Sequence, residues 1–405
     1  MILREDHASP VTAITASFLG GTRFETPSRQ GLSYFTQRLS ARGTLSRSSE
    51  EVAEAFEFVG AAFSPFAAKD LFGASLTLLS RHFETGLRLL VECLRWPAFE
   101  PDELERERRN LLLELSRRPE DTLAWSMELA EALLYRRHPY RFPVRGGRSS
   151  AERWTRADLV AWHRRTFTPD RLVISVVGDQ RPERVRQLVD EVFAGFEPSG
   201  WCPSSGVLEA PPLTRRVRTE RREKRQAAVV LAFLAPRFGT EEADAFEVLH
   251  HILAGMGSRL FVELRDRQGL GYVVNCNLDA RFDSGCFKVY ALVPSAQASR
   301  ARQALLEQLE RLRHEPVSSA ELLRAKKYML GLFEISQQRK STQAFRLAMC
   351  ELLGAGFAAV EDYPRRIRSV TAERVMLVAQ RYLDTQNYCC AQVLGARETA
   401  RVLTP

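Results

Sequence analysis

The sequence lacks a cysteine framework and a long apolar run, either of which would assign it to a common class of protein. Its seven cysteines include no Cys-x-x-Cys pair, and Cys389 and Cys390 are direct neighbours. An odd number of scattered cysteines predicts buried or half-buried thiols in a reducing compartment, not a disulfide framework. Apolar runs such as 173–177 and 227–234 are far shorter than the roughly 18 residues that a membrane-spanning helix needs. We therefore expect a soluble protein that does not insert into a membrane.

Signals for export and for nucleotide binding are also missing. The N-terminal segment shows no apolar stretch followed by a small-residue cleavage site, which favours the cytoplasm. The glycines of Gly255-x-Gly257 do not follow a predicted strand, and they lack the third glycine of the dinucleotide-binding fingerprint. No phosphate-binding loop is therefore predicted.

Positive charge is in excess, with a net charge of +8. The densest basic run, 215–225, includes Glu220 and Glu223 and has no aromatic residue, whereas a nucleic-acid-binding surface concentrates its charge and interleaves aromatic side chains. We expect this run to be a solvated edge strand or linker, and we expect no nucleic-acid partner. A weaker alternative is that the excess charge biases a cavity toward acidic peptides.

Hydrophobic periodicity predicts strands and helices in separate groups. Strands are expected over 11–19, 61–65, 71–79 and 172–177. Helices are expected over 48–58, 82–94, 101–117, 122–134 and 154–166. A capping box at Ser48 to Glu51, and Pro101 followed by two carboxylates, mark two of the helix starts.

The same pattern occurs twice along the chain. Residues 103–112 resemble 321–330, and residues 159–161 resemble 377–379 at the same spacing. A segment rich in proline, glycine and serine lies between the copies and is typical of a linker. We predict an α+β fold with two tandem homologous repeats, each a mainly antiparallel sheet with helices packed on one face. The predicted domains are 1–196 and 214–405, joined by the linker 197–213.

The stretch from Gly31 to Thr44 is the most informative part of the chain. As a helix with Ser28 near its start and Gly43 at its end, it places Tyr34, Gln37 and Arg38 on one face. A second, apolar face consists of Leu32, Phe35 and Leu39. In a zinc-binding His-x-x-Glu-His helix, the first face would carry two histidines with a glutamate as general base.

Further landmarks accompany this helix. Glu107 and Glu114 lie two turns apart on one stripe of the next long helix. The other landmarks are Gly31-Leu32-x-x-Phe35, Arg42-Gly43-Thr44, His138-Pro139-Tyr140, Phe167-x-Pro169-Asp170, Val176-Val177-Gly178-Asp179 and the segment from Gly257 to Tyr272. Over most of its length, the chain resembles the insulinase and mitochondrial processing peptidase family of zinc metallopeptidases.

This resemblance implies that the zinc site of the first repeat has lost its chemistry. In the family, Tyr34 and Arg38 stand where histidines bind zinc, Gln37 stands at the general base, Glu114 at the third ligand and Glu107 at a second acidic residue. Arginine offers five donors, no acceptor and a permanent positive charge. Tyrosine is a poor ligand at its ordinary pKa, and an amide cannot take a proton from water. We predict that this chain binds no metal.

Arg38 and Glu114 are predicted to form a buried ion pair in place of the metal, because a buried carboxylate requires a partner. The alternative is that Glu114 is solvated on a helix face.

Arg265 and Tyr272 are the remaining candidates for chemistry, separated by the turn Gly269-Leu270-Gly271. In the family, these two positions hold the substrate backbone and support the transition state at the zinc of the opposite half. The residue types suit that task, since a guanidinium binds carbonyls or carboxylates and a phenol can donate to an oxyanion. The alternative is a surface-paired Arg265 and a half-buried Tyr272.

The resemblance implies two two-repeat chains around a closed chamber. We predict a non-catalytic subunit of a heterodimeric zinc metallopeptidase, which contributes Arg265 and Tyr272 to peptide binding. The expected partner is a paralogous catalytic subunit with an intact zinc motif, and zinc is expected in that partner alone. The alternative is a structural or assembly protein with the same fold, but the retention of both residues favours the peptidase subunit.

Overall fold

The computed structural model describes residues 1–201, 208–224 and 226–395, which form two compact units. The first unit combines residues 1–116, 142–206 and 332–363. The second combines residues 117–141, 207–331 and 364–405. Each unit therefore contains one segment from the other half of the chain.

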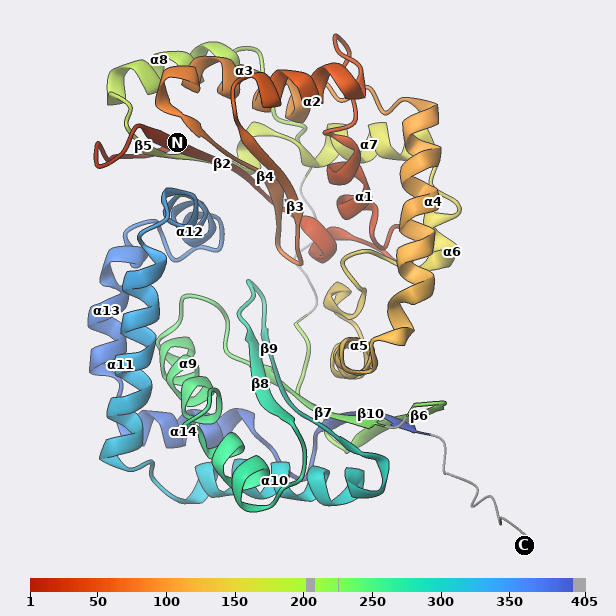
Figure 1. The fold of residues 1–405 in the computed structure, drawn as a ribbon, viewed down its shortest axis with the longest axis vertical. Coiled ribbons are helices and arrows are strands. Elements are labelled where there is room, and N and C mark those ends of the chain that lie inside the picture. The colour runs from red at the N-terminus through yellow and green to blue at the C-terminus, as the bar shows by residue number, and fades with distance from the viewer. Residues whose placement is uncertain (202–207, 225, 396–405) are drawn as a thin grey trace, which may run out of the picture. The chain divides into compact units, whose positions relative to one another are not determined.

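A five-stranded sheet forms the centre of the first unit (Figure 1). Its strands follow the order β1 (Ile2–Glu5), β5 (Leu172–Gly178), β2 (Val11–Leu19), β4 (Leu71–Leu79) and β3 (Ala62–Ala67). β1 and β5 are parallel and the other pairs are antiparallel. In the antiparallel register, Ala16 of the central strand lies opposite Ala74 on one side and Ile174 on the other.

Both faces of this sheet are covered by helices. One face packs on α2 (Ser49–Phe58), α3 (Phe83–Arg95) and α8 (Pro182–Val192), where alternate strand residues such as Ile14, Ala16 and Phe18 enter a large apolar core. The other face receives α12 (Lys340–Leu352), which comes from the second half of the chain. A second apolar cluster joins α1 (Leu32–Leu39), α4 (Pro101–Arg117) and α7 (Arg156–Thr166) with the short α6 (Arg148–Ala151).

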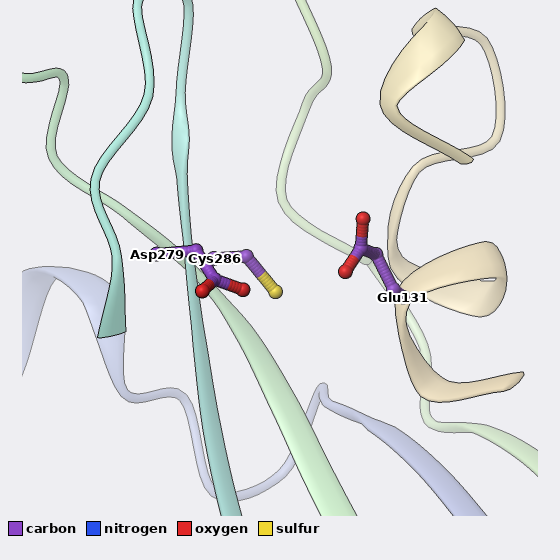
Figure 2. A group of neighbouring side chains, drawn as sticks. All are labelled: Glu131, Asp279 and Cys286. Carbon is purple, nitrogen blue, oxygen red and sulfur yellow. The ribbon is translucent and has the colours of Figure 1, made fainter. Parts of the chain in front are cut away.

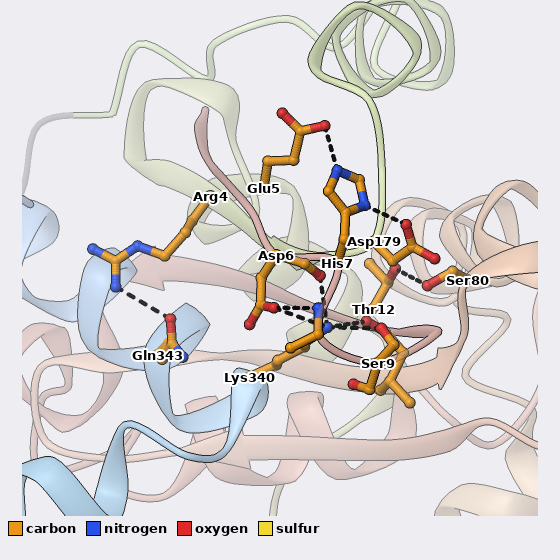
Figure 3. Close-up of polar contacts among 12 residues, drawn as sticks. Arg4, Glu5, Asp6, His7, Ser9, Thr12, Ser80, Asp179, Lys340 and Gln343 are labelled. Atoms are coloured by element: carbon orange, nitrogen blue, oxygen red, sulfur yellow. Dashed lines mark hydrogen bonds and ion pairs between the residues drawn. The ribbon is translucent and has the colours of Figure 1, made fainter.

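Lys340 fixes the start of α12 to the connection between β1 and β2 (Figure 3). Its buried Nζ donates to the backbone carbonyls of Asp6, Ser9 and Val11 at 2.8, 2.9 and 3.1 Å. A single ammonium thus satisfies three carbonyl groups where the chain turns between β1 and β2, because an ammonium carries three donors and no acceptor.

The second unit repeats the strand order of the first. Its strands are β6 (Arg216–Arg222), β10 (Cys389–Gly395), β7 (Gln226–Ala235), β9 (Gly285–Pro294) and β8 (Val273–Asp279), again with one parallel pair, β6 with β10. α5 (Thr122–Leu134), from the first half of the chain, packs on β7 and β10. Further helices are α9 (Glu241–Leu253), α10 (Ala298–His314) and α14 (Ala372–Tyr382). Two others, α11 (Ser319–Ser336) and α13 (Ala359–Ser369), contribute residues to both units.

The repeated strand order confirms the predicted α+β fold with two homologous repeats and mainly antiparallel sheets. The expectation that helices cover one face needs correction. Each sheet also carries one helix from the other repeat, α12 in the first unit and α5 in the second. The central strands β2 and β7 are buried on both faces for this reason. The boundaries 1–196 and 214–405 stay a prediction about the repeat, and part of the linker 197–213 lies outside the described residues.

Local signals predicted most elements well. β2, β4, α4 and α5 have the predicted bounds, and Ser48 and Glu51 form the predicted capping box. The basic run is an edge strand, β6, as expected. The six cysteines in the described part are buried. β1 was not predicted, since four residues, three half-buried and one exposed, offer too short a pattern.

Candidate functional site

The helix α1 is shorter than predicted at both ends: it ends at Leu39 and not at Gly43, and its start is set by glycine geometry. Gly31 precedes the helix with φ of +86°, in the left-handed region, so the helix begins at Leu32 and not near Ser28. The buried carboxylate of Glu25 accepts hydrogen bonds from the backbone N–H groups of Gly31 and Ser33 at 2.7 and 2.9 Å. Glu25 therefore satisfies donors that the first turn leaves unpaired.

Arg38 lies between two carboxylates of α4. Its Nη1 is 2.8 Å from Oε1 of Glu114, and its Nε contacts Oε2 of Glu107. The same Nη1 donates to the hydroxyl of Tyr34 at 3.3 Å. The predicted contact between Arg38 and Glu114 is therefore present, although Glu114 is also partly solvated, as the alternative held.

The predicted burial of the Arg38–Glu114 pair is wrong, because both side chains are partly exposed and the buried carboxylate is Glu107. The side chain of Glu107 is 2% exposed, whereas those of Arg38 and Glu114 are 20% and 35% exposed. The buried partner of Arg38 is therefore Glu107, and this pair was not predicted from the sequence. Burial lowers the pKa of Arg38, but Glu114 and Glu107 raise it by more, so its pKa lies above the ordinary value.

Two further arginines extend this arrangement into a ladder of alternating charges. Arg42 Nε is 3.0 Å from Oε1 of Glu107, and Arg145 Nη1 is 3.6 Å from Oε2 of Glu114. All four carboxylate oxygens of the ladder therefore face a guanidinium. Sequence reasoning missed both arginines. Arg42 could have been found from its spacing of four from Arg38, but Arg145 comes from a distant loop.

The residues of the charge ladder do not fit a zinc ion. A catalytic zinc site needs three ligands with free lone pairs and an open position, but here Arg38, a permanent cation, engages both carboxylates. The amide of Gln37 is 1% exposed and has no hydrogen-bond partner among the described residues. An inward-facing amide without a proton-accepting oxygen cannot act as general base.

Arg265 and Tyr272 are brought together in the second unit. The Arg265 Cζ lies 4.8 Å from the centre of the Tyr272 ring and 4.4 Å from that of Phe261. Arg265 belongs to a π-helical turn, Phe261–Arg267, a geometry that often marks functional sites. Within the described chain it pairs with no carboxylate, and Tyr272 is 77% exposed. The alternatives of a surface ion pair for Arg265 and a half-buried Tyr272 are both wrong.

The turn before Tyr272 requires glycine. A Cβ on Gly271 would lie 2.4 Å from the backbone oxygen of Leu292, and Gly269 has φ of +59°. The close contact at Gly271 and the left-handed backbone at Gly269 explain why both of these positions between Arg265 and Tyr272 are glycine.

A different cluster in the second unit has the geometry of a metal site but not its charge. Glu131, Asp279 and Cys286 place ligand atoms within 4.8 Å of one another (Figure 2). Lys288 Nζ lies 3.1 Å from Glu131 and 2.8 Å from Asp279, and Arg281 Nη2 lies 3.0 and 3.3 Å from the same carboxylates. Two cations thus neutralise two carboxylates, and burial raises the pKa of the Cys286 thiol to about 12. The cluster is a buried group of ion pairs where α5 meets the second sheet.

The histidines of the described chain have structural contacts. His138 is buried, with Nε2 3.0 Å from Asp283 and Nδ1 accepting from the Tyr140 N–H. His163 Nε2 contacts the Leu94 carbonyl at 2.7 Å, and burial lowers the pKa of His163 to about 4. Burial likewise lowers the pKa of His250 to about 4.

None of the helices in the described residues has the length and apolar character to cross a bilayer.

The fold and the two sites define a class. The chain has two five-stranded α+β repeats, with the charge ladder around Arg38 in the first and the Arg265–Tyr272 pair in the second, an arrangement consistent with the zinc-metallopeptidase class that the sequence resembles. Family models agree: residues 1–144 match "Insulinase (Peptidase family M16)", and residues 153–329 match "Peptidase M16 inactive domain". The chain belongs to the insulinase family of peptidases.

Curated relatives extend over nearly the whole chain. An uncharacterized zinc protease of Mycobacterium tuberculosis is 30% identical over 392 residues, covering 95% of this chain and 88% of the relative. An uncharacterized zinc protease of Bacillus subtilis is 27% identical over 377 residues, covering 92% and 90%.

Solved structures show the same fold. The crystal structure of a peptidase M16 inactive domain from Pseudomonas fluorescens has a TM-score of 0.90 at 22% identity, covering 97% of this chain and 95% of that one. The structure of a protease from Helicobacter pylori has a TM-score of 0.91 at 18% identity, covering 97% and 96%. At these identities the likeness concerns the fold alone.

Proposed function

We propose that this chain is the non-catalytic subunit of a two-chain zinc metalloendopeptidase and contributes Arg265 and Tyr272 to peptide binding at its partner's zinc site. One observation carries the proposal. The ligand positions of the first repeat are filled by the charge ladder around Arg38, while Arg265 and Tyr272 form a stacked pair without a carboxylate partner in the described chain.

The chemistry of the pair supports this role. Arg265 offers a planar set of donors that suits a peptide carbonyl or carboxylate. The exposed phenol of Tyr272 can donate a hydrogen bond to the oxyanion that develops when water attacks a peptide bond. The pair supplies no nucleophile and no metal ligand, so hydrolysis requires a zinc-bound water from another chain. The zinc proteases among the relatives support a peptidase setting.

The test is co-expression with a paralogous chain that carries an intact His-x-x-Glu-His motif. We expect a complex that contains about one zinc per two chains and cleaves fluorogenic peptides. The present chain purified alone should contain far less than one zinc per chain and show no cleavage. Absence of both a complex and activity with every such paralogue would overturn the proposal.

Two variants of this chain separate a catalytic contribution from mere scaffolding. Tyr272→Phe and Arg265→Ala should each lower kcat/KM of the complex, by roughly 100-fold for the loss of an oxyanion donor, while its zinc content stays unchanged. Arg237→Ala is a matched control, since Arg237 is an exposed arginine of the same unit that also lies over a ring, that of Phe282. Full activity of both site variants would favour the second candidate, a structural or assembly subunit.

A further inference from the structure

Phe261 is the second aromatic partner of Arg265 and has no role in the function described so far. It precedes Arg265 by four residues in the π-helical turn, and its ring centre is the closer of the two to the guanidinium carbon, 4.4 against 4.8 Å. A guanidinium over an aromatic face is attracted by the ring quadrupole. Phe261 and Tyr272 therefore both draw Arg265 toward one position.

The backbone beneath this stack is fixed by burial. Leu260, Leu264 and Leu270 are fully buried, and they lie directly before Phe261, directly before Arg265 and two residues before Tyr272. The Phe261 N–H also donates to the hydroxyl of Ser258 at 3.3 Å. The core side chains thus hold the backbone of the turn while the three stacked side chains extend from it.

An ion pair ties the start of this segment to α11. Arg259 donates to both carboxylate oxygens of Glu321, at 2.7 and 3.1 Å, a bidentate geometry that is among the stronger side-chain pairings. Hydrogen bonds from Arg259 and Ser318 outweigh the effect of burial and lower the pKa of Glu321 to about 2. The segment is therefore anchored on both sides of Phe261.

With the backbone fixed, the remaining freedom of Arg265 lies in its own side chain. An unpaired arginine loses considerable rotamer entropy when it binds a ligand. Two rings that hold the guanidinium in place reduce this loss before the ligand arrives, and they leave its N–H donors available. Phe261 itself is only half-buried, unlike the core residues Phe246 and Phe287 of the same unit, so packing of the core does not account for it.

We propose that Phe261 is a positioning residue, which holds the Arg265 guanidinium in the orientation that receives a peptide carbonyl or carboxylate. The inference rests on the proposed function for the role of Arg265 in peptide binding. The stack itself belongs to this chain alone and can be measured without a partner.

The first experiment observes Arg265 directly in the isolated chain. In protein labelled with isotopic arginine, ring currents from two aromatic neighbours should displace the Arg265 side-chain NMR signals upfield, and Arg265→Lys identifies them. Phe261→Leu should reduce this displacement by about half, and Phe261→Tyr should retain it. Phe357→Leu, at an exposed phenylalanine of the other unit, should change nothing. Unchanged Arg265 signals in Phe261→Leu would overturn the proposal.

The second experiment uses the two-chain complex and its peptide cleavage. Phe261→Leu should lower kcat/KM about 3- to 10-fold, from the lost cation–π contact and the looser orientation, with unchanged zinc content. Phe261→Tyr should restore activity. In an Arg265→Ala background, Phe261→Leu should have no further effect, because Phe261 acts only through Arg265.

The two experiments separate the two proposals. An equal loss from Phe261→Leu with and without Arg265 would refute the positioning role while leaving the proposed function intact. If no partner yields activity, the proposed function fails, and the NMR signals still decide whether Phe261 orders Arg265.

Discussion

Replacing Arg38 by alanine tests whether the charge ladder stands in for the metal. Glu107 is almost fully buried and Arg38 is one of its two cations. Breaking a buried ion pair from one side costs about 3–5 kcal/mol, because an uncompensated charge remains. Here Arg42 still faces Glu107 at 3.0 Å, so we expect part of that cost, about 2–3 kcal/mol.

The contact with Glu114 adds little. Glu114 is more than a third exposed and keeps Arg145 at 3.6 Å, and exposed pairs contribute about 0–1 kcal/mol. Arg38→Ala should therefore lower the free energy of unfolding by about 2–4 kcal/mol. For a unit of roughly 200 residues, this corresponds to a fall in Tm of about 5–15 °C.

Thermal and urea unfolding followed by circular dichroism give the measurement, with two comparisons. Arg106→Ala removes an exposed arginine of α4 that pairs with Glu103, and it should change stability by less than about 0.5 kcal/mol. The double variant Arg38→Met with Glu107→Leu replaces the buried pair by apolar groups and should recover much of the loss. A single variant as stable as the parent would refute the reasoning, because Glu107 would then not depend on Arg38.

Three other predictions concern single contacts and can be checked by thermal unfolding. Burial lowers the pKa of His163 to about 4 in the fold, against 6.5 ordinarily, so the stability that the neutral imidazole contributes is present above pH 6.5 and is lost as the pH falls toward 4. The stability of His163→Gln relative to the parent should therefore improve by about 2–3 kcal/mol between pH 7 and pH 4.5. A difference that stays constant with pH would contradict this prediction. Lys340→Met removes three hydrogen bonds, to the carbonyls of Asp6, Ser9 and Val11, and should cost roughly 3 kcal/mol at about 1 kcal/mol for each bond. Lys326→Met removes one hydrogen bond, to the Arg368 carbonyl, and should cost about 1 kcal/mol; equal effects would argue against the threefold contact. Gly31→Ala places a Cβ 2.5 Å from the backbone of Gly146 at a φ of +86° and should lower the free energy of unfolding by at least about 3 kcal/mol. Gly60→Ala has a φ of +61° but open space around the Cβ and should cost about 1–2 kcal/mol. A Gly31 variant as stable as the Gly60 variant would disprove the close approach.

The exchange of helices between the repeats has a consequence for folding. α5 and α12 each pack on the sheet of the other half of the chain, so neither half can complete its core alone. The ammonium of Lys340 and the ionic cluster of Glu131 with Arg281 and Lys288 secure these two helices. Separately expressed halves should therefore expose one apolar sheet face each.

Much of the fold could be predicted because its signals are local. Alternation of apolar residues located β2 and β4, and the capping box at Ser48 located α2, since these patterns depend only on neighbours in sequence. The four-residue β1 and the left-handed Gly31 at the start of α1 were missed. β1 depends on pairing with a strand that follows about 170 residues later, and Gly31 on contact with a distant loop.

The sequence by itself determined the repeat, the fold class and the grouping of Tyr34 and Arg38 on one face of a helix, because residue chemistry and periodicity are properties of the chain. Only the tertiary structure decided that Glu107 is the buried carboxylate and Glu114 the half-exposed one, since both lie on the same stripe of α4 and depth depends on what packs above them. It likewise decided that Phe261 completes the stack on Arg265. The spacing of four residues allows Phe261 to contact Arg265, but the contact forms only where the fold buries the neighbouring leucines and so fixes the backbone.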